Sequence, residues 1–309
     1  MNFAEREGSI WLDGEWLPWQ DAKVHVLTHT LHYGLGAFEG IRAYKTQSGT
    51  QIFRLEAHLC RLSNSARLTH LTVPYDQKTL IAACIEVLRK NKLQEGGYIR
   101  PLLFLGSEGM GLHAENVKTH LCISAWKWGA YLGEEGMKKG VRIKTSTYRR
   151  NHIDSLHVHG KICGHYVNSM LALREAQLCG YDEALMLDHL GFIAEGSGEN
   201  FFIVKKGAVY TPCKGTVLEG ITRDTVIQLC ADLGIPCREM NITRDEAYLA
   251  DEAFFTGTAA EITPIREIDG RMIGEGVRGS MTEKLQNAFF EVVQGENPKY
   301  AHWLTMSDV

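Results

Sequence analysis

The sequence predicts a protein of two α/β or α+β domains with a cleft between them. The chain has 309 residues, which suggests two domains when a common domain has roughly 150 residues. Strand-like and helix-like patterns occur in both halves. Glycines and charges gather from Gly129 to Gly136, and we interpret this stretch as a linker. We therefore expect a small domain over residues 1–130, a linker over 131–138 and a large domain over 139–309.

Turn residues and apolar spacing predict the elements of the first half. Asp13-Gly14 is a strong turn signal between two apolar runs, so residues 10–17 are expected to form a hairpin. Apolar residues three and four apart predict one helix from Leu55 to Ala66 and another from Leu80 to Leu88. Two apolar runs predict buried strands over residues 98–105 and 120–126.

The second half continues with strand and helix patterns. The expected strands are residues 141–145, 183–188 and 192–204, of which the last two form a hairpin. The expected helices are residues 166–178 and 222–233. Thr222 is the expected N-cap of the second helix, because a threonine oxygen suits that position and Gly234 follows the end of the pattern.

Composition and charge argue against several classes of function. A net charge of -4 favours neither nucleic acid nor an anionic membrane as a partner, and a small anionic ligand would need a local positive site. No apolar run approaches the roughly 18 residues of a membrane span, and the first residues lack the order of a secretory signal. The eight cysteines form no Cys-x-x-Cys pair, which is typical of free thiols in a reducing cytosol. We expect a cytoplasmic protein.

Two patterns are similar to known binding sites but fit them poorly. Gly34-x-Gly36-x-x-x-Gly40 has the glycines of a dinucleotide loop, but a strand pattern follows where that loop needs a helix. A turn that passes close to a ligand or a partner chain explains these glycines better. The histidines at 152, 157, 159 and 165 cluster, but they lack the spacing and co-ligands of a metal site. We interpret them as part of a loop near a functional lysine.

Lys161, Glu195 and two turns are candidates for such a functional site. Lys161 stands between glycines just before a helix, which leaves room for a bulky planar group, although a lone lysine is usually a solvated charge. Glu195 precedes glycines that break a strand, so it points toward a ligand or is a plain loop carboxylate. Anions could bind at the helix start Leu218–Thr222 or at the turn Thr256–Glu261, but helix caps and tight turns are common.

Several segments together resemble the branched-chain aminotransferase family. Leu31–Arg42 is similar to its amino-terminal signature, and Glu195–Phe201, Gly220–Arg223 and Gly257–Glu261 are similar to its later ones. The resemblance extends from about residue 8 to about residue 295. It implies a pyridoxal 5'-phosphate enzyme with the D-amino-acid-aminotransferase-like fold, called fold type IV. In that fold the cofactor lies between a smaller amino-terminal and a larger carboxy-terminal domain.

The resemblance implies which residues bind the cofactor. Lys161 would carry it as a Schiff base and later move the proton at the substrate Cα. Glu195 would pair with the pyridinium nitrogen, and Tyr166 would contact the ring oxygen. The phosphate would be bound by Arg61, Ile221, Thr222 and Thr258.

The resemblance also implies one pocket for two kinds of substrate. Arg100 would meet the side-chain carboxylate of glutamate, since a guanidinium fork suits a carboxylate. The α-carboxylate would be held by Tyr98 and by the backbone N–H groups of Thr258 and Ala259, with Arg42 in support. Apolar walls for leucine, isoleucine and valine would come from Phe38, Trp128 and Tyr131, while Tyr33 would reach the pocket of the partner subunit.

The implied reaction is a ping-pong transamination between a branched-chain L-amino acid and 2-oxoglutarate, in a homodimer or a trimer of dimers. A D-amino-acid aminotransferase and an aminodeoxychorismate lyase share the fold, but Gly40–Arg42 and Tyr98–Arg100 favour the branched-chain enzyme. A catalytically silent relative would have lost Lys161 or Glu195, and both are present. The residues that depart from the family pattern affect the shape of local loops; they are Cys163, His165 and Glu219.

Overall fold

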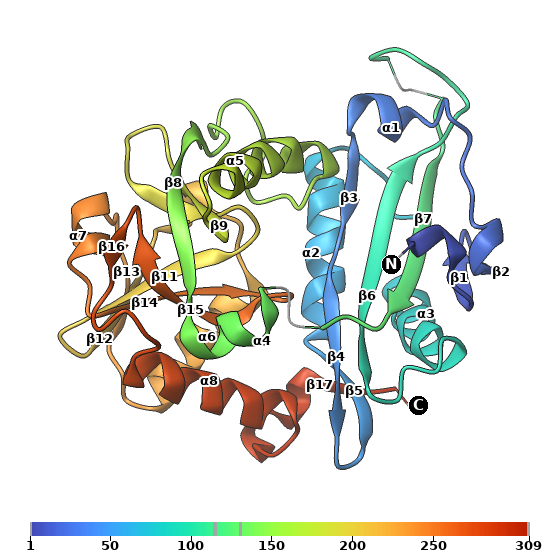
Figure 1. The fold of residues 1–309 in the computed structure, drawn as a ribbon. Coiled ribbons are helices and arrows are strands. Elements are labelled where there is room, and N and C mark those ends of the chain that lie inside the picture. The colour runs from blue at the N-terminus through green and yellow to red at the C-terminus, as the bar shows by residue number, and fades with distance from the viewer. Residues whose placement is uncertain (1, 114–115, 130–131, 308–309) are drawn as a thin grey trace. The chain divides into compact units, whose positions relative to one another are not determined.

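The computed structural model describes residues 2–113, 116–129 and 132–307 (Figure 1). Its packing divides the chain into two units. Unit 1 comprises Met1–Trp128, Gly160–Gly164 and Val292–Val309, and unit 2 comprises Gly129–His159 and His165–Glu291. Neither unit is one continuous range of the chain, because Ile162 and the strand of residues 304–306 pair with strands of unit 1. The expected domains stay a prediction, since packing does not test which ranges fold independently.

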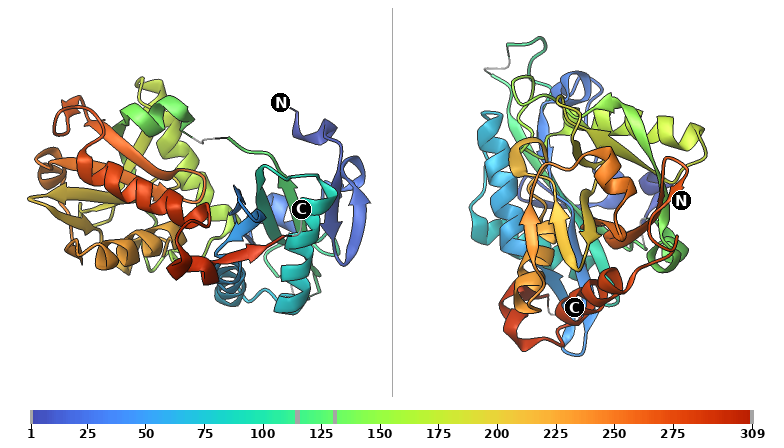
Figure 2. Two further views of the ribbon diagram at one scale, coloured as in Figure 1. Left: turned by 90° about the horizontal axis from the view of Figure 1, so that it is seen from below. Right: turned by 90° about the vertical axis from the view of Figure 1, so that its left-hand side faces the viewer.

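Unit 1 is built on one sheet with two longer helices. In the described residues the strand order is β17-β5-β4-β6-β7-β1-β2, and β3 pairs with β6. Figure 2 shows the C-terminal strand β17, in red, next to the blue strand β5 with which it pairs. The strands are β1 (Ser9–Leu12), β2 (Glu15–Pro18), β3 (Gly36–Phe38), β4 (Ile41–Thr46), β5 (Gly49–Phe53), β6 (Gly96–Leu105), β7 (Thr119–Trp126) and β17 (Leu304–Met306). The helices are η1 (Phe3–Glu5), η2 (Trp19–Asp21), α1 (His29–Tyr33), α2 (Leu55–Leu68), α3 (Gln77–Lys90) and η5 (Pro298–Trp303).

Local sequence explains the elements of unit 1. Asp13 and Gly14 both have positive φ, as the tight turn between β1 and β2 requires, so the predicted hairpin is confirmed. The predicted apolar stripe of α2 is buried, and it packs with the buried face of α3 against the sheet. Helix α3 begins at the N-cap Asp76, whose carboxylate accepts from the Thr79 N–H at 2.8 Å. Both predicted helices of this half are therefore confirmed.

Unit 2 contains a larger sheet, six strands of which close into a ring. Its order in the described residues is β10-β9-β8-β15-β14-β11-β12-β13, and an additional pairing joins β10 to β11. Helix α5 packs on β8 and β9, and α6 packs on β14. The strands are β8 (Val141–Arg149), β9 (Glu183–Leu187), β10 (Ile193–Gly196), β11 (Asn200–Lys205), β12 (Ala208–Thr211), β13 (Cys237–Glu239), β14 (Glu252–Gly257), β15 (Glu261–Ile268) and β16 (Arg271–Met272). The helices are α4 (Gly133–Lys139), α5 (Tyr166–Leu178), η4 (Lys214–Thr216), α6 (Ile221–Asp232), α7 (Arg244–Tyr248) and α8 (Ser280–Val293), the last two residues of which belong to unit 1. The short helix η3 (Cys163–His165) begins in unit 1 and ends in unit 2.

One local prediction is wrong at the level of a single residue. The N-cap before α6 is Gly220 and not Thr222, which lies inside the first turn of the helix. Residues 133–139, most of which lie in the expected linker, form the short helix α4. An ion pair between Glu135 and Lys139, four residues apart, supports this short helix. Within the described ranges, no helix is long and apolar enough to cross a membrane.

Candidate active site

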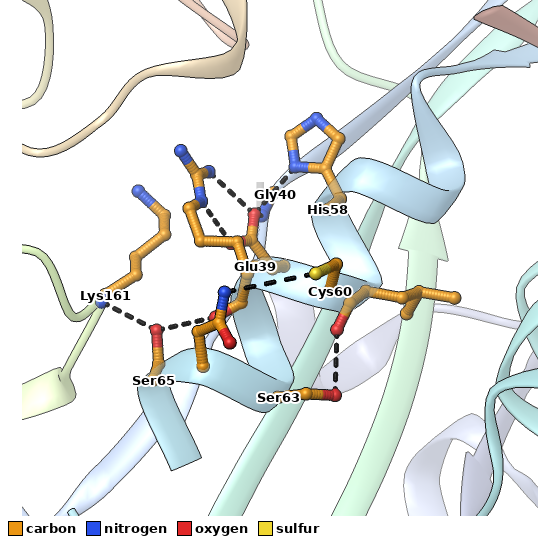
Figure 3. Close-up of polar contacts among 10 residues, drawn as sticks. Glu39, Gly40, His58, Cys60, Ser63, Ser65 and Lys161 are labelled. Atoms are coloured by element: carbon orange, nitrogen blue, oxygen red, sulfur yellow. Dashed lines mark hydrogen bonds and ion pairs between the residues drawn. The ribbon is translucent and has the colours of Figure 1, made fainter. Parts of the chain in front are cut away.

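Lys161 is attached to unit 1 along its backbone (Figure 3). Its N–H donates to the Ser65 Oγ at 2.9 Å, and its carbonyl accepts from the Phe38 N–H at 3.0 Å. The next residue, Ile162, forms a bridge with Ala37 of β3. The Lys161 Nζ lies 5.0 Å from the centroid of the Phe38 ring, a distance at which a cation is attracted to the ring. The backbone of the loop is therefore fixed, and the amine is held near an aromatic face.

The glycines of the first motif allow this attachment. Gly34 has φ +73°, and a Cβ there would lie 3.0 Å from the Gly164 Cα. The Gly164 N–H donates to the Gly34 carbonyl at 2.9 Å. The close approach that the glycines predict thus occurs, but for Gly34 the neighbour is the lysine loop of the same chain.

Arg61 points at a buried acid and does not lie on a solvated face. Its Nε donates to Glu39 Oε1 at 2.6 Å and its Nη2 to Oε2 at 2.9 Å. The same carboxylate lies 2.7 Å from the His58 Nδ1, and Glu39 and His58 are almost fully buried. Burial alone would raise the pKa of Glu39, but Arg61 and His58 hold it well below its usual range. Burial lowers the pKa of His58 more than Glu39 raises it.

Tyr98 and Arg100 form the second cluster of unit 1. The Arg100 Nη2 donates to the Tyr98 hydroxyl at 3.1 Å, and a Cβ at Gly40 would lie 1.8 Å from that hydroxyl. The guanidinium carbon of Arg100 lies 4.8 Å from the Phe38 ring centroid and 5.8 Å from that of Trp126. Its Nε is buried and has no hydrogen-bond partner among the described residues. A charged donor among aromatic rings can take a carboxylate and an apolar chain together.

The other predicted substrate residues of unit 1 lie at different places. Trp128 packs on Tyr98, with ring centroids 4.7 Å apart. Arg42 is opposite Tyr98 in the pairing of β4 with β6, and its guanidinium lies 5.4 Å from the Tyr44 ring centroid. Tyr33 is exposed at the end of α1, where its hydroxyl accepts from the Gly111 N–H at 3.2 Å. Tyr131 lies outside the described residues.

In unit 2, Glu195 is buried on β10 and held by three partners. Its Oε1 lies 2.7 Å from the Arg150 Nε in a buried ion pair. Its Oε2 accepts from the Asn200 Nδ2 and from the Leu218 N–H, each at 3.1 Å. These charge-assisted contacts hold the carboxylate in a fixed orientation. Glu195 is therefore not a plain loop carboxylate.

Asn200 connects Glu195 to the start of α6. Its Nδ2 also donates to the Leu218 carbonyl at 2.9 Å, and a Cβ at Gly220 would lie 1.9 Å from its Oδ1. Ile221 and Thr222 follow as the first residues of α6, both buried. Their N–H groups belong to the positive end of a helix of 12 residues, which suits a phosphate.

The remaining predicted residues of unit 2 lie at an element start and in a turn. Tyr166 is the first residue of α5. Thr258 and Ala259 form the turn between β14 and β15, and both are partly buried. The Thr256 hydroxyl at the start of this turn is buried and has no hydrogen-bond partner in the described part of the chain. Such an unsatisfied donor is consistent with a polar ligand at the turn.

Sequence reasoning missed several residues of these clusters. Glu39, Ser65 and Trp126 belong to unit 1, and Arg150 and Asn200 to unit 2. Trp126 had a signal, since it lies two positions before Trp128; in the structure their ring centroids are 5.5 Å apart. Glu39 and Arg150 gave none, because their partners Arg61 and Glu195 are 22 and 45 positions away.

Three other sequence features are resolved by the structure. Glu219 is exposed beside Lys214, and its Oε2 lies 3.4 Å from the Lys214 Nζ. Burial raises the pKa of Cys163 to about 11. In the described ranges no group of His, Cys, Asp and Glu could hold a metal ion. A cavity of about 840 Å³ in unit 2 is lined by α4, α5 and the strand starts near Glu183, and none of the predicted site residues that the structure describes line it.

Comparisons with known proteins cover nearly the whole chain. The family described as Amino-transferase class IV matches residues 36–268. A branched-chain-amino-acid aminotransferase of Pseudomonas aeruginosa is 54% identical over 306 residues, 99% of this chain and 99% of the relative. One of Escherichia coli is 44% identical over 297 residues, 96% of each chain.

Solved structures of such enzymes have the same fold. The crystal structure of the Escherichia coli enzyme has a TM-score of 0.95 at 43% identity, over 98% of this chain and 100% of that one. Structures of the T.th. enzyme with pyridoxamine 5'-phosphate and with N-(5'-phosphopyridoxyl)-L-glutamate each have a TM-score of 0.94 at 44% identity, over 98% and 99%. Its complex with 4-methylvaleric acid has a TM-score of 0.93 at 42% identity, over 98% and 99%. The predicted two-domain α/β fold class is confirmed.

Proposed function

The chain belongs to the class IV aminotransferase family, and on this premise we propose that it is a branched-chain-amino-acid aminotransferase. It transfers the amino group of L-leucine, L-isoleucine or L-valine to 2-oxoglutarate, with pyridoxal 5'-phosphate as cofactor. The observation that carries the proposal is the Arg100 guanidinium among the rings of Phe38, Tyr98 and Trp126. The glutamate adduct and the 4-methylvaleric acid in structures of the T.th. enzyme support both halves of this pocket.

The two units offer groups that fit the parts of the cofactor. Pyridoxal 5'-phosphate supplies an aldehyde that an amine can hold and a ring that withdraws electrons from the substrate Cα. In unit 1, Lys161 offers the amine and Arg61 a cation for the phosphate. In unit 2, Glu195 offers a buried carboxylate for the ring nitrogen, and the start of α6 offers N–H groups for the phosphate.

Each cofactor residue then has a definite task. Lys161 binds the cofactor and afterwards moves the proton at the substrate Cα, acting as base and acid in turn. Glu195 would pair with the ring nitrogen, and its ion pair with Arg150 holds the carboxylate in place. Tyr166 donates to the ring oxygen. Ile221, Thr222 and Thr258 complete the phosphate site with Arg61.

The substrate residues position the amino acid. Tyr98 and the backbone N–H groups of Thr258 and Ala259 bind the α-carboxylate, and Arg42 supports that region. Arg100 binds the second carboxylate of glutamate or 2-oxoglutarate. Phe38, Trp128 and Tyr131 form the apolar walls, which bind the branched side chains and exclude water. The same pocket therefore serves both half-reactions.

We also propose that the chain forms a homodimer, alone or within a trimer of dimers, with Tyr33 reaching the pocket of the partner subunit. Exposed apolar side chains gather near α1, namely Val26, Leu27, Leu31, Met110 and Leu112. The loop that carries the last two is tied to α1, because the His29 N–H donates to the Gly106 carbonyl at 2.7 Å. An apolar patch of this kind is typical of an interface between copies of a chain.

The test of the function adds one amino acid to the cofactor-loaded protein without any oxo acid and follows the visible spectrum. L-Leucine is expected to bleach the band of the bound cofactor, while D-alanine leaves it unchanged. Bleaching by D-alanine alone would make the chain a D-amino-acid aminotransferase. A band that survives both amino acids would favour the lyase.

A further inference from the structure

Two residues of helix α2, Ser65 and Arg61, hydrogen-bond to Lys161 and to Glu39 in unit 1 (Figure 3). Ser65 and Arg61 are four residues apart, so they lie on the same face of the helix. The Ser65 Oγ accepts from the Lys161 N–H and donates to the Arg61 carbonyl, each at 2.9 Å. The Arg61 guanidinium in turn is bound to Glu39. The backbone of the lysine loop and the head group of Arg61 are thus both set by α2 and its neighbours.

Glu39 binds one edge of the Arg61 guanidinium. Both of its oxygens are used, one by Nε and the other by Nη2, so the plane of the guanidinium is fixed. The opposite edge, which contains Nη1, therefore faces away from Glu39. A lysine at position 61 would have no such plane to fix.

Glu39 is itself held firmly. Its backbone N–H donates to the Pro101 carbonyl at 2.9 Å, and Oε2 also accepts from the Gly40 N–H at 3.3 Å and lies 2.7 Å from the His58 Nδ1. The residue is completely buried. Burying a carboxylate costs much desolvation free energy, which these donors offset. An apolar side chain at this position could not fix the orientation of an arginine.

We propose that Glu39 is a positioning residue for the cofactor phosphate, which it serves by turning the far edge of Arg61 toward that group. The proposal rests on the assignment of Arg61 to the phosphate in the proposed function. Glu39 itself touches neither the cofactor nor the substrate. Its effect is therefore specific to ligands that carry the phosphate.

The test compares two ligands of the apoenzyme. Pyridoxal 5'-phosphate and pyridoxal are titrated separately, and the visible absorbance on binding to Lys161 gives each dissociation constant. Glu39→Gln is expected to raise the dissociation constant of pyridoxal 5'-phosphate by about tenfold or more, because a charged bidentate pair is lost. The dissociation constant of pyridoxal is expected to stay unchanged. Arg61→Ala should show the same selectivity, and the double variant should be no weaker than Arg61→Ala alone.

Glu86→Gln is the matched control. Glu86 binds Arg89 on α3 with the same pattern, Nε to one oxygen at 2.6 Å and Nη2 to the other at 2.5 Å, but on the surface. Its removal should change neither constant. If Glu39→Gln does not fold, Glu39→Asp carries the test, since it keeps the charge and is expected to weaken only the phosphate ligand.

The outcomes separate the two proposals. Unchanged binding of pyridoxal 5'-phosphate by a folded Glu39 variant would overturn the role of Glu39. Equal weakening of both ligands would also overturn it, because the effect would then be on the fold and not on the phosphate. If Arg61→Ala leaves the phosphate ligand unaffected, the assignment of Arg61 in the proposed function is the part that fails.

Discussion

Arg100 and Arg61 show how the surroundings of one residue type decide its use. Arg61 faces a buried carboxylate that fixes its plane. Arg100 donates to the Tyr98 hydroxyl, and its buried Nε is without a partner among the described residues. A buried unsatisfied guanidinium nitrogen is unfavourable until an acceptor arrives. Arg100 is therefore prepared for a carboxylate, and Arg61 is held in a fixed orientation.

Arg100→Ala is expected to separate the two substrates. The Michaelis constant for L-glutamate should rise about tenfold or more, since a charged hydrogen bond contributes about 1.5–3 kcal/mol. The constant for L-leucine should change little, because its side chain carries no charge. Steady-state rates with each amino acid measure the difference, and Arg89→Ala on the surface is the control. Full glutamate turnover by the variant would remove Arg100 from substrate recognition.

Glu183 gives a prediction about pH. Burial raises the pKa of this carboxyl from 4.5 to about 6, and its Oε2 has no hydrogen-bond partner in the described residues. A raised folded pKa means that the stability from the protonated form is present below pH 4.5 and is lost as the pH rises through 6. Glu183→Gln should therefore be more stable than the natural chain at pH 8, by at most about 2 kcal/mol, and nearly equal to it at pH 5.

Urea unfolding of both proteins at pH 5 and pH 8 checks this prediction. Glu175→Gln should change the stability at pH 8 in the opposite direction. Hydrogen bonds from Ser146 and Thr147 outweigh the effect of burial and lower the pKa of Glu175. That variant should be less stable than the natural chain at pH 8. A Glu183 variant that loses stability at pH 8 would show that the carboxylate is stabilised in the fold.

At the scale of elements, the start of α6 depends on a contact between segments that are far apart. Gly220 precedes the helix, and the space of its missing side chain is occupied by Asn200. Asn200 in turn holds Glu195 and the Leu218 carbonyl. The side-chain amide of Asn200 thus connects Glu195 on β10 with the turn before α6. Thr222 was predicted as the cap from local preference alone, and this contact explains why Gly220 takes that place.

Gly220→Ala should damage this junction. The added Cβ would lie 1.9 Å from the Asn200 Oδ1, so Asn200 must move, at a cost of about 1–3 kcal/mol of unfolding free energy. Affinity for pyridoxal 5'-phosphate should fall as well. Gly215→Ala is the control, because a Cβ there meets nothing within 4 Å. Thermal unfolding of the apo proteins and cofactor titration measure the two effects.

The same elements show what the sequence could and could not predict. Periodic apolar spacing predicted α2 and α3, and the turn pair predicted the first hairpin, because these signals are local. The resemblance predicted where Lys161 and Glu195 occur in the chain. The partners of Arg61 and Glu195 could not be predicted, since the pairing of Arg61 with Glu39 and of Glu195 with Arg150 arises only when distant segments pack. Helix α4 was missed because its glycines are typical of loops.

At the scale of the whole molecule, the exposed apolar side chains near α1 bear on assembly. Leu31→Asp should disrupt the proposed interface between copies and give the mass of a single chain in light scattering, because a charge in an apolar interface is strongly unfavourable. Leu249→Asp is the control, since Leu249 is equally exposed outside this patch. An unchanged mass for Leu31→Asp would place the interface on another face.

The pairing of β17 with β5 has a consequence for synthesis of the chain. Leu304 pairs with Phe53, and at about 5–20 residues per second a ribosome needs about 10–50 seconds to make the chain between them. The free edge of β5 is open during that time, and such edges favour aggregation. The edge of β5 is therefore covered only after residues about 250 positions later have been made, when the neighbouring strand β4 has long been available.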